Sequence, residues 1–200
     1  DNRINLSYEI VESEISKVSK IIFIGNNSFS SSKLKSIMKT KERRFLRFLS
    51  SADRYDPDKI EYDKQLISQF YSNNGFPNFT FTSTIAQLSQ NTNTFEVIMY
   101  INEGDKYNFG EIKVSTKLKK INPDAALSMI TASKGETFDR SKISDSIEII
   151  KELAEIEGYS FIQINPKFRD NLEEKTINIE IDINEGPRVY VNSISIKGNT

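Results

Sequence analysis

The sequence predicts an α+β protein of two tandem modules, each with the element order βααββ and a three-stranded mixed sheet covered on one face by two helices. Three observations predict this fold. One type of strand ending occurs three times along the chain, each long helical segment ends in glycine followed by an aromatic residue, and the strands alternate apolar and polar residues. A helix pair on one side of each sheet leaves the other side exposed to solvent.

The repeated strand ending combines an isoleucine with a glutamate two residues later, and it occurs at residues 10–13, 101–104 and 183–186. A second apolar strand follows each ending and contains Ile21, Ile112 and Ile194, respectively. Both landmarks are offset by 91 residues between the first and second copies and by 82 between the second and third. Two landmarks with the same offsets indicate an internal structural repeat.

The helices of the first module have clear start signals. Ser30 to Ser32 offer N-caps for a short helix, and Asp56-Pro57 offers a cap and a first-turn proline for a longer one. Apolar residues at helical spacing follow each start: Leu34, Ile37 and Met38, then Leu66, Ile67, Phe70 and Tyr71. The longer helix ends at Gly75-Phe76, because glycine can adopt positive φ there and the aromatic ring folds back onto the core.

The second module repeats this order. Asn122-Pro123 starts a short helix, and a longer helix ends at Gly158-Tyr159, 83 residues after the first such stop. Its apolar face consists of Ile143, Ile147, Ile150 and Ala154. A hairpin closes each module, and its last strand alternates apolar and polar residues over 95–101 in the first module and 177–183 in the second. This last strand is expected to be central in its sheet.

The repeat predicts the borders of the modules. We expect the first module at 13–104 and the second at 105–187. Residues 1–12 would be the last strand of a preceding module, and residues 188–200 the first strand of a following one. The chain is therefore expected to be part of a longer array.

The composition argues against an enzyme. The chain contains no cysteine and no histidine, which supply most zinc ligands, most general bases at neutral pH and every Ser-His or Cys-His pair. We therefore expect no catalytic residues, no metal and no cofactor. Ser30 and Lys33 match the Ser-x-x-Lys spacing of acyl-transfer enzymes, but a serine run before a helix is far more often a cap. Acidic pairs such as Glu103 with Asp105 stand at strand ends, where solvated charge is expected.

The charges also argue against nucleic acid as a partner. The 27 basic and 28 acidic residues nearly cancel and are scattered along the chain, so no basic patch is expected. A KH-type reader would need a Gly-x-x-Gly loop between its helices, and the sequence has no such loop. No apolar run approaches the ~18 residues that a membrane-spanning helix needs.

A βααββ repeat with the Ile-x-Glu-Gly ending, the glycine-aromatic stop and a Gly-Asn pair after the first strand resembles the POTRA domain. The Gly-Asn pair occurs at 25–26 and 198–199, whereas the second module has Thr116-Lys117 instead. The resemblance covers essentially the whole chain. The long insertion Lys39 to Tyr55 resembles the third POTRA repeat of the BamA family, which makes the second module similar to the fourth.

This resemblance implies a location in the periplasm, as part of a cell outer membrane protein attached to the membrane through a C-terminal β-barrel. It also implies a role in outer membrane protein assembly, without ATP or metal. The implied partners are unfolded outer membrane protein clients and accessory lipoproteins. The alternative is the POTRA region of a two-partner secretion or related transporter, which usually carries fewer modules.

In such a module, an extended partner strand would pair with an exposed sheet edge. If the last strand of each module is central, the residues around 79–85 and 160–168 form the edges. The predicted protein-binding residues are Phe79, Thr80, Phe81, Thr82, Ser83 and Ile85. The alternative interpretation is that both segments are solvent-facing hairpin arms without a binding role, and this interpretation is favoured for the second module.

A second candidate contact lies in the insertion, which mixes cations with large apolar side chains. Its residues are Arg43, Arg44, Phe45, Arg47 and Phe48. This composition suits a partner protein or a membrane surface. It equally suits a plug that covers the end of the first module.

Overall fold

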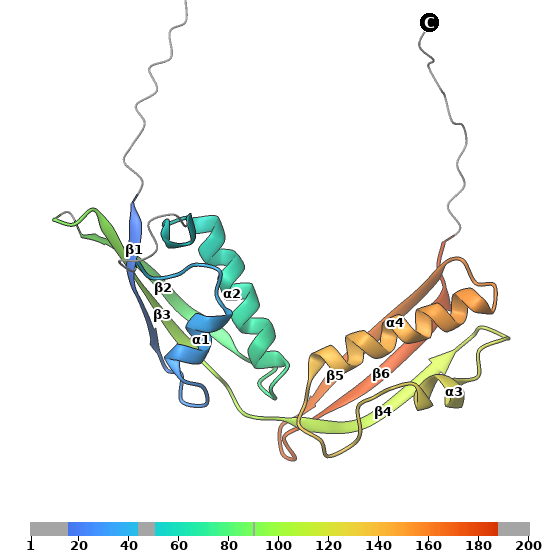
Figure 1. Cartoon of the computed structure of the whole chain (residues 1–200). Helices are drawn as coiled ribbons and strands as arrows, with labels where there is room; N and C mark the ends of the chain where they lie inside the picture. Colours follow the sequence, from blue (N-terminus) through green and yellow to red (C-terminus); the bar gives the residue numbers. More distant parts are fainter. Residues whose placement is uncertain (1–15, 44–50, 90, 188–200) are drawn as a thin grey trace, which may run out of the picture. The chain divides into compact units, whose positions relative to one another are not determined.

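A computed structural model describes residues 16–43, 51–89 and 91–187. The chain divides into two compact units, with the main boundary between Glu103 and Gly104 (Figure 1). The predicted end segments 1–12 and 188–200 lie outside the described residues, and the predicted module borders stay a prediction. No helix in the described ranges is long and apolar enough to cross a membrane.

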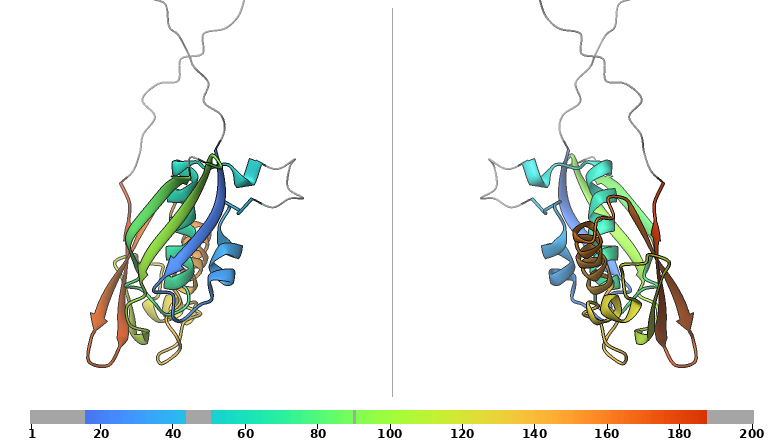
Figure 2. Two further views of the ribbon diagram at one scale, coloured as in Figure 1. Left: turned by 90° about the vertical axis from the view of Figure 1, so that its left-hand side faces the viewer. Right: turned by 90° about the vertical axis from the view of Figure 1, so that its right-hand side faces the viewer.

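The first unit contains three strands, two α-helices and a short 3-10 turn. In chain order they are β1 (Lys17–Ile24), α1 (Ser31–Ile37), η1 (Ser51–Asp53), α2 (Pro57–Ser72), β2 (Thr80–Ser89) and β3 (Thr94–Asn102). The sheet has the order β1-β3-β2, with β1 parallel and β2 antiparallel to the central β3. In the left view of Figure 2, the strands lie in front of α2, so this face of the sheet has no helix over it.

The second unit repeats the arrangement. Its elements are β4 (Asn108–Thr116), α3 (Pro123–Ser128), α4 (Arg140–Ile156), β5 (Ile162–Asn171) and β6 (Thr176–Glu185). The sheet has the order β4-β6-β5, again with a parallel pair and an antiparallel hairpin around the last strand. The predicted α+β class, with a three-stranded mixed sheet in each βααββ unit, is confirmed.

Each core lies between the helices and the helix-facing side of the central strand. In the first unit the fully buried side chains include Val18, Ile21, Leu34, Ile67, Val97 and Met99. In the second they include Phe109, Phe138, Ile143, Ile150, Ile177, Ile179, Ile181 and Ile183. Each such side chain contributes roughly 1.5–3 kcal/mol on burial, so these alternating strand positions determine which face of each sheet carries the helices.

The glycine-aromatic stop works as the sequence predicts. Gly75 and Gly158 have φ of +97° and +90°. The next amide donates back into the helix, from Phe76 N to Tyr71 O at 3.0 Å and from Tyr159 N to Ala154 O at 2.9 Å. Both helices therefore end in the same left-handed turn, with a hydrogen bond over five residues.

The predicted helix caps are also present. Ser30 Oγ accepts from Lys33 N at 3.2 Å, so the Ser-x-x-Lys spacing is a helix N-terminus. Asp56 Oδ1 accepts from Asp58 N at 3.0 Å at the start of α2, and Asn122 Oδ1 accepts from Asp124 N at 2.8 Å at the start of α3. These contacts satisfy backbone donors that the first turn of a helix leaves free.

Candidate protein-binding edge

Each sheet has two outer strands, and one of them is partly covered in each unit. Val18 O on β1 accepts from Arg43 N at 2.8 Å, and Ser16 O, just before the strand, accepts from Tyr55 N at 2.9 Å. Ile21 N donates to Glu42 Oε1 at 2.9 Å. Residues near both ends of the insertion thus occupy hydrogen-bonding groups along the outer side of β1, which reduces the room for another strand there.

The equivalent strand β4 is covered by the loop before α4. Phe109 N donates to Glu136 O and Phe109 O accepts from Gly135 N, both at 2.8 Å. Phe138 N donates to Tyr107 O at 3.0 Å. The start of β4 therefore has a backbone partner on each side, although the covering loop differs from that of the first unit.

Strand β2 forms the opposite edge of the first sheet and, among the described strands, pairs with β3 alone. Thr80, Thr82, Ser83 and Ile85 are exposed on it, and Phe81 is partly buried. Phe79 precedes the strand and is only 8% exposed, with its ring edge-on to that of Phe81 at 5.1 Å between centroids. The structure therefore groups the predicted residues on one edge, with Phe79 supporting the strand from the core.

The chemistry of β2 is that of an unprotected edge. Its ten residues contain no charged side chain, no proline and no glycine. Soluble proteins usually protect such edges with lysine, proline or a bulge, because unpaired N–H and C=O groups recruit other chains. The pairing of β2 with β3 has one register shift, between Phe81 and Ser83, and such an irregularity disrupts an edge locally. The segment from Thr84 to Ser89 pairs regularly and is not protected in this way.

Strand β5, the corresponding edge of the second unit, carries a proline. Gly186 N donates to Phe161 O at 2.9 Å, and the register to β6 then continues without a shift. In an antiparallel pair, the backbone N–H and C=O groups of successive residues point alternately toward the partner strand and away from it. Because Phe161 O bonds to Gly186 N, the backbone groups of odd-numbered residues point toward β6, and the backbone nitrogen of Pro166 points to the free edge. An outward-facing proline removes one donor from the free edge. Lys167 and Arg169 add charge beside it.

The two edges correspond position by position. Ser89 pairs with Thr94 and Asn171 with Thr176 at the hairpin ends, and Asn93 and Lys175 both have positive φ before the return strand. Thr84 and Pro166 each lie five residues before the closing pair, so Thr84 N–H is an outward donor where the second unit has none. The sequence reasoning missed that Thr84 and Pro166 are equivalent positions, although they are 82 residues apart, the same offset as between the second and third strand landmarks.

Charged side chains cover the helix-free face of the second sheet. Lys167 Nζ lies 2.7 Å from Asp182 Oδ2, and Arg169 Nη2 lies 3.0 Å from Glu180 Oε2. Hydrogen bonds from Lys167 and then from Ser115 hold the pKa of Asp182 below its usual value, and the bond to Asp182 raises the pKa of Lys167. These pairs are solvent-exposed, so they orient side chains more than they stabilise the fold.

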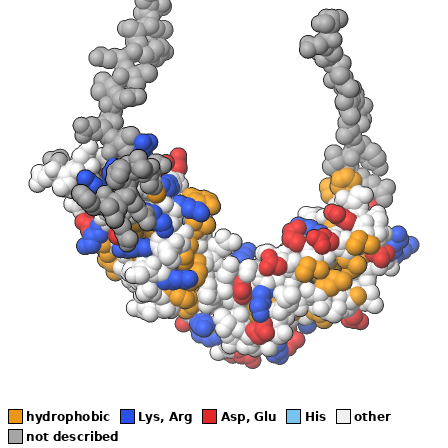
Figure 3. Space-filling model, viewed as in Figure 1, with side chains coloured by type: hydrophobic (Ala, Val, Ile, Leu, Met, Phe, Trp, Pro, Cys, Tyr) orange, Lys and Arg blue, Asp and Glu red, His pale blue; other side chains and the backbone are white. Residues whose placement is uncertain are grey.

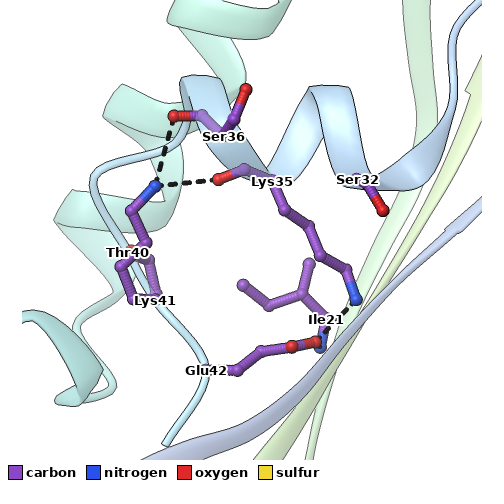
Figure 4. Close-up of a pocket in the computed structure, with 7 residues that line it drawn as sticks. All are labelled: Ile21, Ser32, Lys35, Ser36, Thr40, Lys41 and Glu42. Atoms are coloured by element: carbon purple, nitrogen blue, oxygen red, sulfur yellow. Dashed lines mark hydrogen bonds and ion pairs between the residues drawn. The ribbon is translucent and has the colours of Figure 1, made fainter. Parts of the chain in front are cut away.

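A cavity of about 350 Å³ lies beside α1 (Figure 4). Its lining residues are Ile21, Ser32, Lys35, Ser36, Thr40, Lys41 and Glu42. Lys35 pairs with Glu42 at 2.7 Å, and Lys41 Nζ donates to the carbonyls of Lys35 and Ser36 at 2.9 and 3.2 Å. The cations thus fasten the insertion to the end of α1. The described residues contain no group of side chains arranged to hold a metal ion.

The second unit also carries an acidic helix face. In Figure 3 acidic side chains gather where Figure 1 draws α4. The exposed acidic residues of this helix are Asp145, Glu148, Glu152 and Glu155. Their spacing is that of a single helix face, and Glu148 pairs with Lys151 at 2.7 Å, as expected of a solvated surface.

Residues 16–104 and 107–186 each match the family model of POTRA, described as "Surface antigen variable number repeat". The chain belongs to the POTRA family. This confirms the family resemblance that the strand endings and helix stops indicated.

Two curated relatives show how much of a longer protein such POTRA units represent. The chain is 24% identical over 198 residues to the outer membrane protein assembly factor BamA of Neisseria meningitidis serogroup B, covering 99% of this chain and 25% of the relative. It is 22% identical to a putative outer membrane protein assembly factor of Treponema pallidum, covering 96% of this chain and 23% of the relative. The chain thus spans about a quarter of the length of these relatives.

Solved structures give the same fold. The POTRA3-5 region of Haemophilus influenzae BamA matches with a TM-score of 0.73 and 25% identity, covering 94% of this chain and 73% of that one. BamA of Haemophilus ducreyi lacking POTRA domains 1-3 matches at 0.62 and 11% identity, covering 85% of this chain and 29% of that one, which shows the fold alone. The predicted similarity to BamA POTRA repeats is confirmed. The finer assignment to the third and fourth repeats stays a prediction.

The POTRA strand ending has a structural role that the expectation of solvated charge missed. Glu103 is only 8% exposed and accepts from Ser28 N at 2.9 and 3.1 Å and from Ser28 Oγ at 2.8 Å. Gly25, at φ +99°, lies against the carbonyl of Ile101. The glycine and the glutamate together fasten the loop after β1 to the end of β3. The sequence signal for this contact was that the glycine after the first strand and the glutamate at the strand ending both belong to the repeated pattern.

The second POTRA unit fastens its loop differently. Glu185 is exposed, and Thr116 replaces the glycine, with its Oγ1 accepting from Leu118 N at 3.0 Å. Lys120 N instead donates to the hydroxyl of Tyr159 at 3.3 Å. The aromatic residue after α4 thus helps to hold the loop after β4 in the second unit.

Most of the predicted insertion contact lies outside the described residues. This applies to Arg44, Phe45, Arg47 and Phe48. Arg43 is described, its side chain is exposed, and its backbone amide is bonded to β1. The role of the insertion as a partner or membrane contact stays a prediction.

Proposed function

We propose that this chain is the periplasmic scaffold and client-binding region of an outer membrane β-barrel assembly protein, and that it binds extended protein segments by strand addition to β2. The observation that carries the proposal is the contrast between the edges. The outer side of β1 has partners within its own unit, whereas β2 has an uncharged, proline-free edge beside β3.

The expected affinity follows from the size of the edge. About four to six backbone hydrogen bonds, at a net ~0.5–1.5 kcal/mol each, would contribute several kcal/mol. Loss of translational and conformational freedom offsets much of this, so binding is weak and reversible. Weak binding suits a scaffold that must release its clients.

The proposed partners are unfolded outer membrane protein clients and accessory lipoproteins, with attachment to the membrane through a barrel elsewhere in the protein. The relatives compared above are named as assembly factors, which supports this role over that of a secretion transporter. The insertion residues near Arg43 are a second proposed contact for a partner or membrane surface.

A proline placed in β2 tests strand addition. Thr84→Pro gives the first unit the residue that the second unit has at the equivalent position, and it removes an outward donor without breaking the ladder to β3. Thr84 Oγ1 has no hydrogen-bond partner among the described residues, so no side-chain bond is lost. An extended outer membrane peptide, followed by amide chemical shifts, should bind the variant about two- to tenfold more weakly.

Thr84→Val is the matched control, because it keeps the backbone donor and the side-chain shape. It should bind the peptide as the unchanged chain does. Unaltered β3 amide signals would show that Thr84→Pro still folds. Equal affinity for the folded proline variant, or peptide-induced shifts that bypass residues 79–85, would contradict strand addition at this edge.

A further inference from the structure

The helix-free face of the first sheet carries a row of isoleucines that runs to the β2 edge. Ile22 on β1 pairs with Ile98 on β3, and Ile98 pairs with Ile85 on β2. Val97 and Met99, the neighbours of Ile98 along β3, are fully buried against the helices. Because successive strand residues point to opposite faces, Ile98 and its two partners lie on the other side, the side facing the viewer in the left view of Figure 2.

This row is open to contact. Ile85 is 46% exposed, and Ile22 and Ile98 are partly exposed. The next row consists of Ile24, at 44% exposed, with Tyr100 and Ser83. The apolar surface therefore reaches the free edge at Ile85 instead of ending inside the sheet.

The two β2 residues next to Ile85 on the helix-free face carry no charge. On one side of Ile85 along β2 is Ser83 and on the other Gln87. The nearest charges on this face, Lys20 and Glu96, lie 3.8 Å from each other. A charged side chain placed beside Ile85 would lose water and gain no counter-ion, whereas an apolar one would gain buried area.

We infer that Ile85, Ile98 and Ile22 form a specificity surface for the added strand, which selects uncharged segments with an aliphatic or aromatic side chain beside Ile85 on the helix-free face. The inference rests on the proposed strand addition. A strand bonded to β2 continues the pleat, so every second side chain falls in line with these rows. The side chain directly opposite Ile85 lies ~4.5–5.5 Å away between Cβ atoms, close enough to pack.

The occupant is a strand, because the apolar rows adjoin backbone groups of β2 that have no backbone partner within the described ranges. A helix laid on the face would leave the N–H and C=O groups of the β2 edge without partners, whereas an extended segment satisfies both features together. The neutral edge also favours a neutral segment, since β2 offers no charge to complement.

The strand itself provides a matched pair of variants. Ile85 and Leu88 are equally exposed, at 46% and 45%, but pair with Ile98 and Phe95 and so point to opposite faces. The probe is a nine-residue peptide of alternating valine and threonine with terminal lysines, titrated into the whole 200-residue chain. Ile85→Thr should weaken binding roughly two- to fivefold, and Leu88→Thr by less than twofold.

Further peptides distinguish a failure of the specificity surface from a failure of strand addition itself. A peptide with serine in place of valine should bind weakly and should not distinguish Ile85→Thr from the unchanged chain. A peptide N-methylated at alternate amides should lose binding, and if it binds like its parent, strand addition itself fails. If N-methylation abolishes binding but the two threonine variants behave alike, strand addition stands and the specificity surface is wrong. Self-association lost in Ile85→Thr with unchanged peptide affinity would also overturn the surface, because its occupant would be a second copy.

Discussion

The two POTRA units share one fold but present different surfaces to other proteins. Their central strands β3 and β6 bury matching apolar rows against two helices. On the helix-free face, the row through Ile98 is apolar, whereas the corresponding row through Glu180 is charged, with Lys113 and Lys167 on either side of Glu180. The fold constrains the helix-facing positions, and the outward positions remain free to diverge.

The same divergence occurs at the edges. Pro166 blocks one donor on β5, and charged neighbours accompany it, while β2 has neither. A repeat in which each unit kept the unprotected edge would offer several sites for uncontrolled pairing. Among the described strands, the uncharged and proline-free hairpin edge is β2 of the first unit. Under the proposed strand addition, we therefore expect binding at β2 in preference to β5, where Pro166 removes a donor.

The largest effect is expected where the two units fasten the loop after their first strand. Gly25→Ala would place Cβ against the carbonyl oxygen of Ile101 at φ +99°, whereas the second unit has Thr116 at this position. We expect a loss of at least ~2 kcal/mol in the unfolding free energy of the first unit. Urea denaturation followed by amide signals from each unit measures this.

Gly135→Ala is the control for backbone strain alone. Gly135 has φ +87°, but a Cβ there meets nothing within 4 Å. The control should lose only ~1 kcal/mol, and in the second unit. Equal losses in the two variants would mean that positive φ, and not the contact with Ile101, determines the cost.

A smaller effect is expected from the reciprocal change at the protected edge. Pro166→Thr gives β5 the donor that Thr84 supplies in β2, so the second unit should gain weak binding of the valine-threonine peptide. The gain should remain below the affinity of β2, because Lys167 and Arg169 still charge the strand. Peptide titration monitored at β5 amides checks this. Binding equal to that of β2 would show that proline alone separates the two edges.

The sequence predicted the fold well because the fold depends on local signals. The caps at Ser30 and Asn122, the stops after Gly75 and Gly158 and the alternation along β6 each specify an element without reference to distant residues. What required coordinates was pairing between distant segments. Periodicity in β1 does not reveal that residues near Arg43 and Tyr55 bond its outer side.

The candidate site was predicted in part for the same reason. The edge position of β2 followed from a central last strand, but the row Ile22, Ile98 and Ile85 depends on the register of three strands. A register shift by one residue reverses which side chains share a face, and composition does not determine the register. Glu103 was misjudged because its partner Ser28 is 75 residues away.

The smallest expected effect concerns the ion pairs of Lys167 with Asp182 and of Arg169 with Glu180 on the helix-free face of the second unit. Asp182 has its pKa lowered by hydrogen bonds from Lys167 and then Ser115, relative to a usual value of 3.8. A carboxyl group whose folded pKa is lowered stabilises the folded state above its unfolded pKa, and this contribution is lost as the pH falls through the folded pKa. Lys167→Gln should therefore lower the stability of the second unit slightly and evenly between about pH 5 and 7, with the difference shrinking below 3.8.

A carboxyl carbon NMR titration should place the pKa of Asp182 higher in Lys167→Gln than in Ser115→Ala, and higher in both than in the unchanged chain. If neither variant moves it, the face is solvated without pairing, and the contrast between the two units rests on the apolar row of the first alone.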